Sequence, residues 1–363
     1  MRQPITRPEA GGPFASRVAF AAAHVVHDPW SEDDRLDWDA TLRFRHHLWS
    51  LGFGVAEAMD TSQRGMGLEW PDARELIIRS GAEARASGAR IACGAGTDQL
   101  TGPVDLAAVI AAYEEQIAVV EDTGSQVIIM ASPALASTAR GAEDYHAVYA
   151  RLLSQVARPV ILHWLGPKFL PSAEGYWGSA DLDTATESLL GLIKEWAPKV
   201  DGVKLSLLDA EREQALRRVL PDGVRMYTGD DFNYPDLILG DDQGHSDALL
   251  GIFDPIAPAA ATALRALDAG DEKTYAAALA PTLPVARHLF AAPTYHYKTG
   301  VVFLSWLAGH QDNFTMVGGR QSARSLRHLV RAFVLADQAG LLPDPDLAAA
   351  RMQNLLAVAG FRP

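Results

Sequence analysis

The sequence is poor in the features that mark several large classes of protein. It contains a single cysteine, Cys93, which excludes an intrachain disulfide and any zinc site built on cysteines. It has no block of lysine or arginine residues, and its net charge is -13. A field of that sign repels phosphate backbones, so we expect no nucleic-acid partner. No run of about 18 apolar residues is present, and we therefore expect no membrane-spanning segment.

The N-terminal residues, MRQPITRPEAGGPFASR, also lack the apolar core of a signal peptide. Together with the near absence of cysteine, this predicts a cytoplasmic protein. The first 15 residues are rich in proline, glycine and charge, and we expect them to form a flexible arm.

Short apolar segments of strand length recur along most of the chain. They are almost continuous in apolar residues, which is typical of parallel strands that are covered on both faces. The predicted strands are 18–26, 54–59, 90–94, 127–131, 160–164, 202–205, 224–228 and 249–253.

Longer segments with apolar residues at helical spacing separate these strands. The predicted helices are 39–51, 71–87, 104–122, 143–156, 181–196 and 209–220. Eight successive units of this kind predict an α/β fold, a closed (β/α)8 TIM barrel. A doubly wound open sheet is the competing architecture. The count of eight units and the lack of a glycine-rich phosphate fingerprint after the first strand disfavour it.

After Pro258 the strand pattern stops and helical segments follow. They are predicted at 259–269, 272–291, 298–309, 321–339 and 346–358. We expect the first of them to complete the barrel and the others to form additional C-terminal helices, which either cap the barrel or build an oligomer interface. The predicted division is a flexible arm at 1–15, the barrel at 16–270 and the helical appendage at 271–363.

Active sites of such barrels lie at the C-terminal ends of the strands, and Lys204 is the most informative residue there. It lies inside the segment Asp-Gly-Val-Lys-Leu-Ser, although lysine is rarely buried without a partner. A desolvated amine has a lowered pKa and attacks carbonyl carbons to form an imine. The alternative is a lysine at a strand end that reaches solvent or pairs with Asp230.

Histidine and carboxylate side chains follow several other predicted strands. His163 ends the strand before Lys204, where an imidazole could carry protons; the alternative is a hydrogen-bonded core histidine. The other candidates at strand ends are His24, His27, Asp60, Asp230 and Asp231. These groups also suit zinc, manganese or iron and could instead assemble a metal site. Since no compact motif such as His-Glu-x-x-His is present, we expect neither a metal nor another cofactor.

Five segments, in the same order along the chain, carry a resemblance to a known family. Gly-Val-Lys at 202–204 resembles the segment with its imine-forming lysine, and Tyr-Thr-Gly-Asp-Asp at 227–231 resembles its Ser-Gly-Asp-Asp. The other matches are Gly-Ala-Gly-Thr at 94–97, Ala-Leu-Leu-Gly-Ile at 248–252 with Ala257-Pro258, and His-Leu-Phe at 288–290 with Tyr297-Lys298.

From about residue 17 to residue 309 the sequence therefore resembles the dihydrodipicolinate synthase and N-acetylneuraminate lyase superfamily, in an uncharacterised synthase-like branch. The resemblance implies a (β/α)8 barrel with extra C-terminal helices. It also implies Lys204 as the Schiff-base residue and a dimer or tetramer.

The sequence departs from that family around the expected site. His163 stands where the family usually has a proton-donating tyrosine, and Pro-Ala-Leu replaces the Tyr-Tyr segment of its proton relay. The Gly-Thr-Thr-Gly-Glu loop, which binds the keto-acid carboxylate, is replaced by Met-Asp-Thr-Ser-Gln-Arg-Gly at 59–65. Asp60 in that loop disfavours a carboxylate unless Arg64 compensates. Lys168 stands near the family's carboxylate-binding arginine, as a point charge in place of a bidentate fork.

These residues predict a class I (Schiff-base) lyase, aldolase or dehydratase that acts on a small keto acid or keto sugar. Lys204 forms the imine in this hypothesis, and His163, with Asp60 and Thr61, moves protons. The predicted substrate-binding residues are Ser62, Lys168, Gly229, Asp230 and Leu250. The alternatives are a metal-dependent barrel lyase or hydrolase with histidine and aspartate ligands, and a non-catalytic barrel that binds a sugar acid. We expect a small-molecule carbonyl partner and a homo-oligomer.

Overall fold

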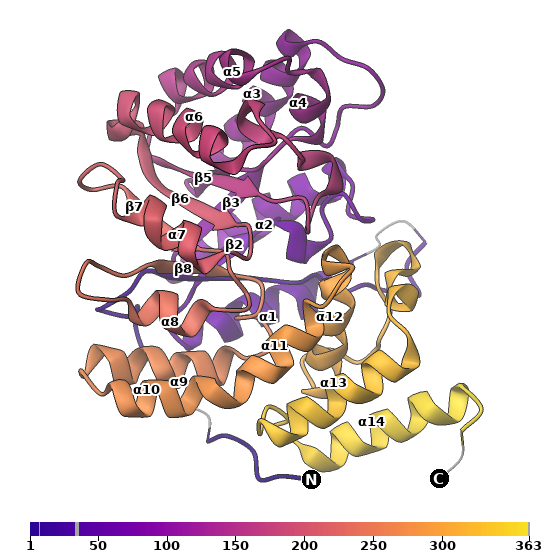
Figure 1. Cartoon of the computed structure of the whole chain (residues 1–363). Coiled ribbons are helices and arrows are strands. Elements are labelled where there is room, and N and C mark those ends of the chain that lie inside the picture. The colour runs from indigo at the N-terminus through magenta and orange to yellow at the C-terminus, as the bar shows by residue number, and fades with distance from the viewer. Residues whose placement is uncertain (7, 33–35, 362–363) are drawn as a thin grey trace.

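The computed structural model describes residues 1–6, 8–32 and 36–361, with eight parallel strands at its centre (Figure 1). Each strand pairs with its neighbour along the chain, and β1 pairs with β8, so that the sheet closes on itself. The strands are β1 (Ala19–Ala22), β2 (Gly54–Glu57), β3 (Ile91–Ala95), β4 (Gln126–Ile129), β5 (Val160–Leu165), β6 (Val200–Ser206), β7 (Arg225–Thr228) and β8 (Asp247–Leu250). The predicted barrel is confirmed, and each predicted strand overlaps an observed one.

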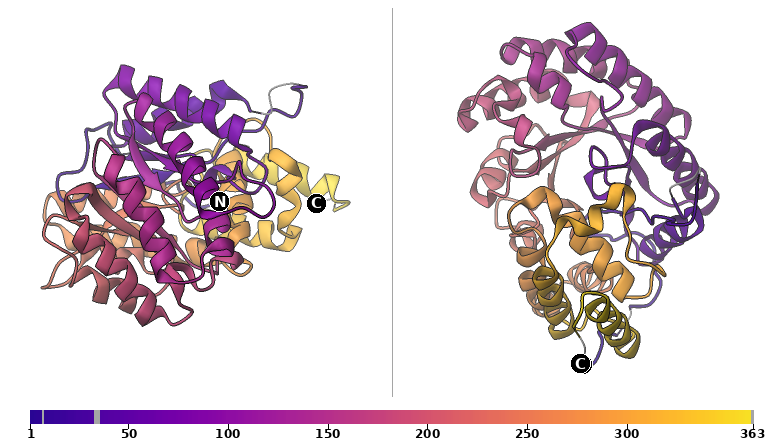
Figure 2. Two further views of the ribbon diagram at one scale, coloured as in Figure 1. Left: turned by 90° about the horizontal axis from the view of Figure 1, so that it is seen from above. Right: turned by 90° about the vertical axis from the view of Figure 1, so that its right-hand side faces the viewer.

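Helices surround the strands (Figure 2, right). They are α1 (Trp38–Ser50), α2 (Trp70–Ser87), α3 (Leu106–Asp122), α4 (Pro133–Thr138), α5 (Ala142–Gln155), α6 (Leu182–Glu195), α7 (Ala210–Arg217), α8 (Tyr234–Leu239) and α9 (Ala257–Asp268). The short 3-10 helices among them are η1 (Asp60–Ser62), η2 (Pro171–Ala173), η3 (Tyr176–Gly178) and η4 (Ala197–Lys199). None of the described helices is both long and apolar enough to cross a membrane.

Local sequence explains where four of these helices begin. The side chains of four aspartates each accept a hydrogen bond from the backbone N–H three residues further on, and this satisfies one of the unpaired donors of the first turn. These N-caps are Asp37, Asp105, Asp181 and Asp209. The helices α4 and α8 were not expected, because six residues are too few to show a helical period.

Alternation along each strand divides the side chains between the barrel interior and the layer beneath the helices. The interior cluster consists of Phe20, Ala22, Ala56, Met59, Ala92, Ile128, Met130, Ile161, Tyr227 and Leu249. On β6, Val203 and Leu205 belong to the outer layer. Lys204 lies between them and therefore faces the interior.

The C-terminal helices gather on one side of the barrel, in orange to yellow in Figure 1. They are α10 (Glu272–Leu279), α11 (Leu283–Leu289), α12 (Tyr297–Leu307), α13 (Leu326–Gln338) and α14 (Pro345–Val358), with the 3-10 helices η5 (Ala280–Thr282), η6 (Thr294–His296) and η7 (Val317–Ala323). Every residue of α12 is buried, so this helix is the centre of the group.

The prediction of one helix over 272–291 is wrong. The segment is divided into α10, η5 and α11, with Pro281 and Pro284 near the starts of the two later pieces. Proline lacks an N–H donor and clashes with the preceding turn, so it favours such breaks. The helix predicted from residue 321 begins only at Leu326, because η7 comes first.

The segment expected to be a flexible arm makes hydrogen bonds to the C-terminal half of the chain. The N–H of Ile5 donates to the carbonyl of Gly340 at 2.9 Å. Nearer the barrel, the Ala15 N–H donates to the Asp268 carboxylate at 3.0 Å. These contacts lay the described residues of the segment along α9 and the turn after α13.

A buried ion pair joins α1 to the end of β2. Arg45 Nε donates to Glu57 Oε2 at 2.8 Å and Arg45 Nη2 donates to Glu57 Oε1 at 2.9 Å, and both side chains are fully buried. Arg45 Nη1 also donates to the carbonyls of His24 and Thr41, and Glu57 Oε1 accepts from the Ala58 N–H. The pair thus fastens the ends of β1 and β2 beside the loop that carries Asp60.

Replacement of Arg45 by methionine is expected to lower the free energy of unfolding by about 3–5 kcal/mol, because the Glu57 carboxylate then stays buried without its cation. The double variant Arg45→Met/Glu57→Leu should recover at least half of that loss, because no charge is left in the interior. Urea denaturation measures both changes. A double variant as unstable as the single one would contradict this account.

Candidate active site

Lys204 lies at the centre of the candidate site, near the C-terminal end of β6. His163 is its register partner on the neighbouring strand β5. Ser206 follows two residues later on β6, so its side chain faces the same way. Lys204 is 7% exposed, which leaves this side chain largely withdrawn from water.

Gly229, directly after β7, allows the backbone to pass close to Lys204. A Cβ at this position would lie 2.2 Å from Ser206 Oγ, 2.7 Å from the Leu205 carbonyl oxygen and 3.0 Å from Lys204 Cε. The Gly229 N–H donates to the same Leu205 carbonyl at 2.9 Å. A larger residue would therefore displace either the strand or the lysine.

Two carboxylates set the charge around the amine. Burial lowers the pKa of Lys204, and the negative charges of Asp60 and Asp231 oppose this. Burial raises the pKa of Asp231 to about 7, against the effect of the Ile252 N–H, which donates to its Oδ1 at 2.8 Å, and of the Lys204 charge. Burial therefore favours the uncharged form of both groups, and the uncharged amine is the nucleophilic form.

His163 is fully buried beside this pair. Its Nε2 lies 3.1 Å from Ser206 Oγ, while its Nδ1 has no hydrogen-bond partner within the described part of the chain. Burial, and then the charge of Lys204, lower the pKa of His163 well below its ordinary value. The imidazole is therefore neutral and able to accept a hydrogen bond at one of its nitrogens.

The loop after β2 meets the start of α12 at the mouth of the barrel. Thr61 Oγ1 lies 2.7 Å from the hydroxyl oxygen of Tyr297, and both residues are buried. Burial, and then the charge of Asp60, raise the pKa of Tyr297 well above its usual value. This phenol therefore keeps its proton and is able to donate a hydrogen bond.

A second buried lysine, Lys298, follows Tyr297. Its Nζ donates to the Tyr295 carbonyl at 3.1 Å and lies 3.2 Å from Met66 Sδ, a weak acceptor. Burial lowers the pKa of Lys298 to about 8, and the charge of Asp60 opposes this. Asp60 thus influences both lysines of the site.

The predicted substrate-binding residues lie in different environments. The hydroxyl of Ser62 donates to the Ala23 carbonyl at 2.7 Å. Lys168 is exposed on the loop after β5, next to Phe169, whose ring centroid is 6.1 Å from that of Tyr297. Leu250 packs in the outer layer, because the inward position on β8 belongs to Leu249.

The two aspartates after β7 have different partners. Asp230 Oδ1 accepts from the N–H groups of Phe232 and Asn233 at 2.8 and 3.0 Å, and its Oδ2 accepts from the Asn233 side chain at 2.9 Å. Asp230 therefore stabilises the turn, and of these two aspartates it is Asp231 whose charge raises the pKa of Lys204.

Arg64 does not offer its guanidinium group to a substrate. It donates to the carbonyls of Ala58 and Gly94 at 3.2 and 3.0 Å, to Gln116 Oε1 at 2.7 Å, and to both carboxylate oxygens of Asp98. Arg64 holds the loops after β2 and β3 together. Asp60 therefore interacts electrostatically with Lys298, and not with Arg64 as the sequence suggested.

The histidines considered for a metal site are occupied separately. His24 Nδ1 lies 2.7 Å from Asp254 Oδ2, and His27 Nδ1 lies 2.8 Å from Thr315 Oγ1. Across residues 1–6, 8–32 and 36–361, no three histidine, cysteine, aspartate or glutamate side chains are arranged to hold a metal ion.

Several groups at the site were not assigned a role from the sequence. Ser206 could have been found, because a residue two positions after Lys204 on a strand shares its face. Asp231 differs from Asp230 only through the geometry of the turn. Tyr297 and Lys298 reach the site from a helix far along the chain, and the resemblance was the one signal for them.

Residues 1–361 match a family model described as a protein of unknown function, DUF993. No curated protein matches the sequence. Solved structures with the same fold include YagE, a prophage protein of the dihydrodipicolinic acid synthase family from E. coli in complex with pyruvate, with a TM-score of 0.71, 12% identity and coverage of 90% of this chain and 99% of that one.

Two further solved structures are dihydrodipicolinate synthases. The Aquifex aeolicus protein has a TM-score of 0.70, 12% identity and coverage of 90% of this chain and 99% of its own. The Acinetobacter baumannii protein, complexed with pyruvate, has a TM-score of 0.66, 17% identity and coverage of 90% and 100%. At this identity the likeness shows the fold, and it confirms the expected resemblance at that level.

The variant Gly229→Ala is expected to lower the free energy of unfolding by about 1–3 kcal/mol, because the new Cβ overlaps Ser206 and Lys204. Gly191→Ala is the matched control, since a Cβ there meets nothing within 4 Å and Gly191 lies inside α6. The control should raise stability by about 0.5–1 kcal/mol. Thermal unfolding distinguishes the two, and equal effects would contradict the close approach.

Proposed function

Because the chain belongs to the DUF993 family and has the barrel of the dihydrodipicolinate synthases, we propose that it is a lyase or aldolase acting on a small carbonyl compound through an imine at Lys204. The observation that carries this proposal is the burial of the Lys204 amine at the C-terminal end of a barrel strand. Burial favours the uncharged amine, which is the form that attacks a carbonyl carbon. A lysine that paired with Asp230 or extended into solvent would lack this environment.

The proposed reaction begins when the neutral Lys204 nitrogen bonds to the substrate's carbonyl carbon and the protonated Asp231 donates its proton to the carbonyl oxygen, which becomes a hydroxyl. Asp231, with a pKa of about 7, accepts the proton that the attacking nitrogen loses and returns it to the hydroxyl, which leaves as water. The resulting iminium group withdraws electrons from the adjacent carbon. The adjacent carbon can then take part in three reactions. Its bond to the next carbon can be cleaved, it can form a bond to the carbon of a second carbonyl group, or a hydroxyl group on the next carbon can be eliminated.

The surrounding side chains are assigned to proton transfer. His163 and Ser206 lie on the β5–β6 side of the amine, and His163 is proposed to accept hydrogen bonds and protons from intermediates. Asp60, with the Thr61–Tyr297 pair, lies on the other side and is proposed to act on the substrate's hydroxyl groups. In this proposal, the role of the tyrosine that the family resemblance implies on β5 is divided between these two groups of side chains, one on each side of the amine.

The charges at the mouth favour a small keto acid or keto sugar. One of the two acceptors of the Lys298 ammonium group is the sulfur of Met66, which binds only weakly. Lys298 is therefore proposed to bind a substrate carboxylate or phosphate. Lys168 is exposed nearby on the loop after β5 and is proposed to assist. Asp60 accepts hydrogen bonds from hydroxyl groups. A homo-oligomeric state and a cytoplasmic location stay predictions from the sequence.

Borohydride reduction in the presence of a panel of keto acids and keto sugars is expected to trap a substrate-dependent adduct, because reduction makes the imine permanent. Intact mass and peptide mapping should place the adduct on Lys204. Lys204→Ala should give none, whereas Lys298→Met, which removes the other buried lysine, should still form it. An adduct on a different lysine, or turnover of a panel compound that survives in Lys204→Ala, would refute the proposal.

The variant Asp231→Asn is expected to move the midpoint of adduct formation against pH downward, because the carboxylate no longer stabilises the charged form of Lys204. Removal of a negative charge lowers the pKa of the amine, so the nucleophile appears at lower pH. Cyanoborohydride trapping across a pH series measures the midpoint. Asp236→Asn, on the exposed face of α8, should leave it unchanged, and an upward shift in Asp231→Asn would contradict the assignment.

A further inference from the structure

The loop after β5, residues 166–175 (the β5 loop), extends to the C-terminal helices. Its aromatic side chain, Phe169, is half-buried. The centre of the Phe169 ring lies 6.1 Å from that of Tyr297, at the start of α12, and 6.3 Å from that of Phe290, at the end of α11. Ring contacts therefore connect the β5 loop to these two helices.

Tyr297 lies on the opposite side of the barrel from β5. Its hydroxyl oxygen is 2.7 Å from Thr61 Oγ1, in the loop after β2. A Cβ at Gly251, directly after β8, would lie 3.1 Å from the Tyr297 ring. In the closed sheet, both β2 and β8 are three strands away from β5. To reach Tyr297, the β5 loop must therefore span the mouth of the barrel, which is the end at which Lys204 lies.

The β5 loop is fastened firmly only near its two ends. The Gly166 N–H donates to the Ser206 carbonyl at 3.0 Å, and beyond the other end the hydroxyl of the buried Tyr176 accepts from the Ser132 N–H at 3.0 Å. Between these points, within the part of the chain that the structure describes, the backbone of residues 167–174 forms hydrogen bonds only with Gly166 or within itself. Apolar contacts alone hold the middle of the loop, and segments held in this way open at a low cost in free energy.

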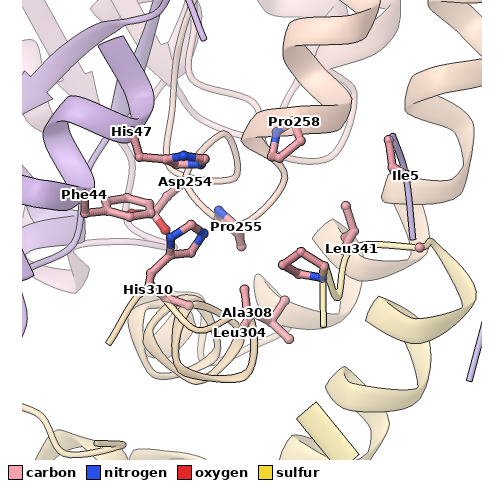
Figure 3. A pocket seen from close by; sticks show the side chains of 13 residues that line it. Ile5, Phe44, His47, Asp254, Pro255, Pro258, Leu304, Ala308, His310 and Leu341 are labelled. Carbon is pink, nitrogen blue, oxygen red and sulfur yellow. The ribbon is translucent and has the colours of Figure 1, made fainter. Parts of the chain in front are cut away.

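The site needs a route for its substrate. The Lys204 side chain is 7% exposed, yet a carbonyl carbon must reach its amine. A cavity of about 120 Å³ lies beside Phe44 and Leu304, between α1 and the C-terminal helices (Figure 3). None of the residues assigned to the reaction lines this cavity, so it offers no route to the amine. The mouth beneath the β5 loop is the remaining approach, because active sites of such barrels open at the C-terminal ends of the strands.

We propose that the β5 loop is a lid, which opens to admit the substrate and closes over the imine with Phe169 as its latch. This inference rests on the function proposed for Lys204. The closed loop keeps bulk water from the imine, which water would otherwise hydrolyse. Gly175, at the far end of the loop, has a φ of +77°, a conformation that favours glycine.

Reductive methylation with formaldehyde and dimethylamine–borane measures access to each lysine amine in the absence of any substrate, and peptide mapping gives the rates. Phe169→Ala removes the latch and is expected to raise the rate at Lys204 at least about tenfold, equivalent to about 1.4 kcal/mol of preference for the closed form. Phe333→Ala, which truncates a half-buried ring on α13, should leave that rate unchanged. Lys199, directly before β6 at the other end of the barrel, is the internal reference and should react equally in all variants.

A second variant separates a moving lid from a fixed cover. Gly175→Ala keeps every side chain of the loop, and its new Cβ would meet no atom nearer than 3.8 Å, so the change strains only the backbone of the closed form. It should also raise the rate at Lys204, whereas Gly191→Ala should not. An increase in Phe169→Ala alone would mean that the loop is a fixed cover, and no increase in either variant would mean that the loop does not control access. Both results refute the lid.

The methylation rates and the trapping of keto compounds fail independently. If both loop variants expose Lys204 but no keto compound is trapped on it, the lid stands and the proposed chemistry is wrong. If a keto compound is trapped on Lys204 while neither loop variant changes its methylation rate, the chemistry stands and the lid is wrong.

Discussion

The burial of the Lys204 amine inside the barrel is the constraint to which the rest of the candidate site responds. An ammonium group withdrawn from water must lose its proton or gain compensating charge, and this site provides for both outcomes. Asp60 and Asp231 favour the charged form, while burial favours the neutral one. Burial likewise raises the pKa of Asp231 to about 7, so the same withdrawal from water favours the uncharged form of both groups.

Buried polar contacts hold the loops of this site in place. Arg45 and Glu57 fasten the ends of β1 and β2, and Arg64 fastens the loops after β2 and β3. Because these guanidinium groups are fully engaged by the protein's own acceptors, they hold the loops in position. Such support keeps reacting groups within the narrow geometry that catalysis requires. The helix α12 connects the C-terminal helices to the loop after β2, because Tyr297 at its start contacts Thr61 in that loop.

The same barrel carries different side chains here from those that the family resemblance implies. The threonine-rich loop after the second strand has become a segment with Asp60, and a buried His163 replaces a tyrosine. A fold constrains where an active site lies, but the substrate depends on side chains such as these. The proposed shift toward hydroxyl-bearing substrates follows from that acidic loop.

The sequence by itself determined the barrel and placed Lys204 on one of its strands. Both depend on short-range patterns, because strand side chains alternate with a period of two and apolar runs mark the strands. Tertiary structure alone decided that Asp231 faces the amine while Asp230 caps a turn, that Leu250 faces outward, and that Tyr297 meets Thr61 across 236 residues of chain. A turn's geometry and the docking of a distant helix depend on the packing of the whole fold, which no local pattern encodes.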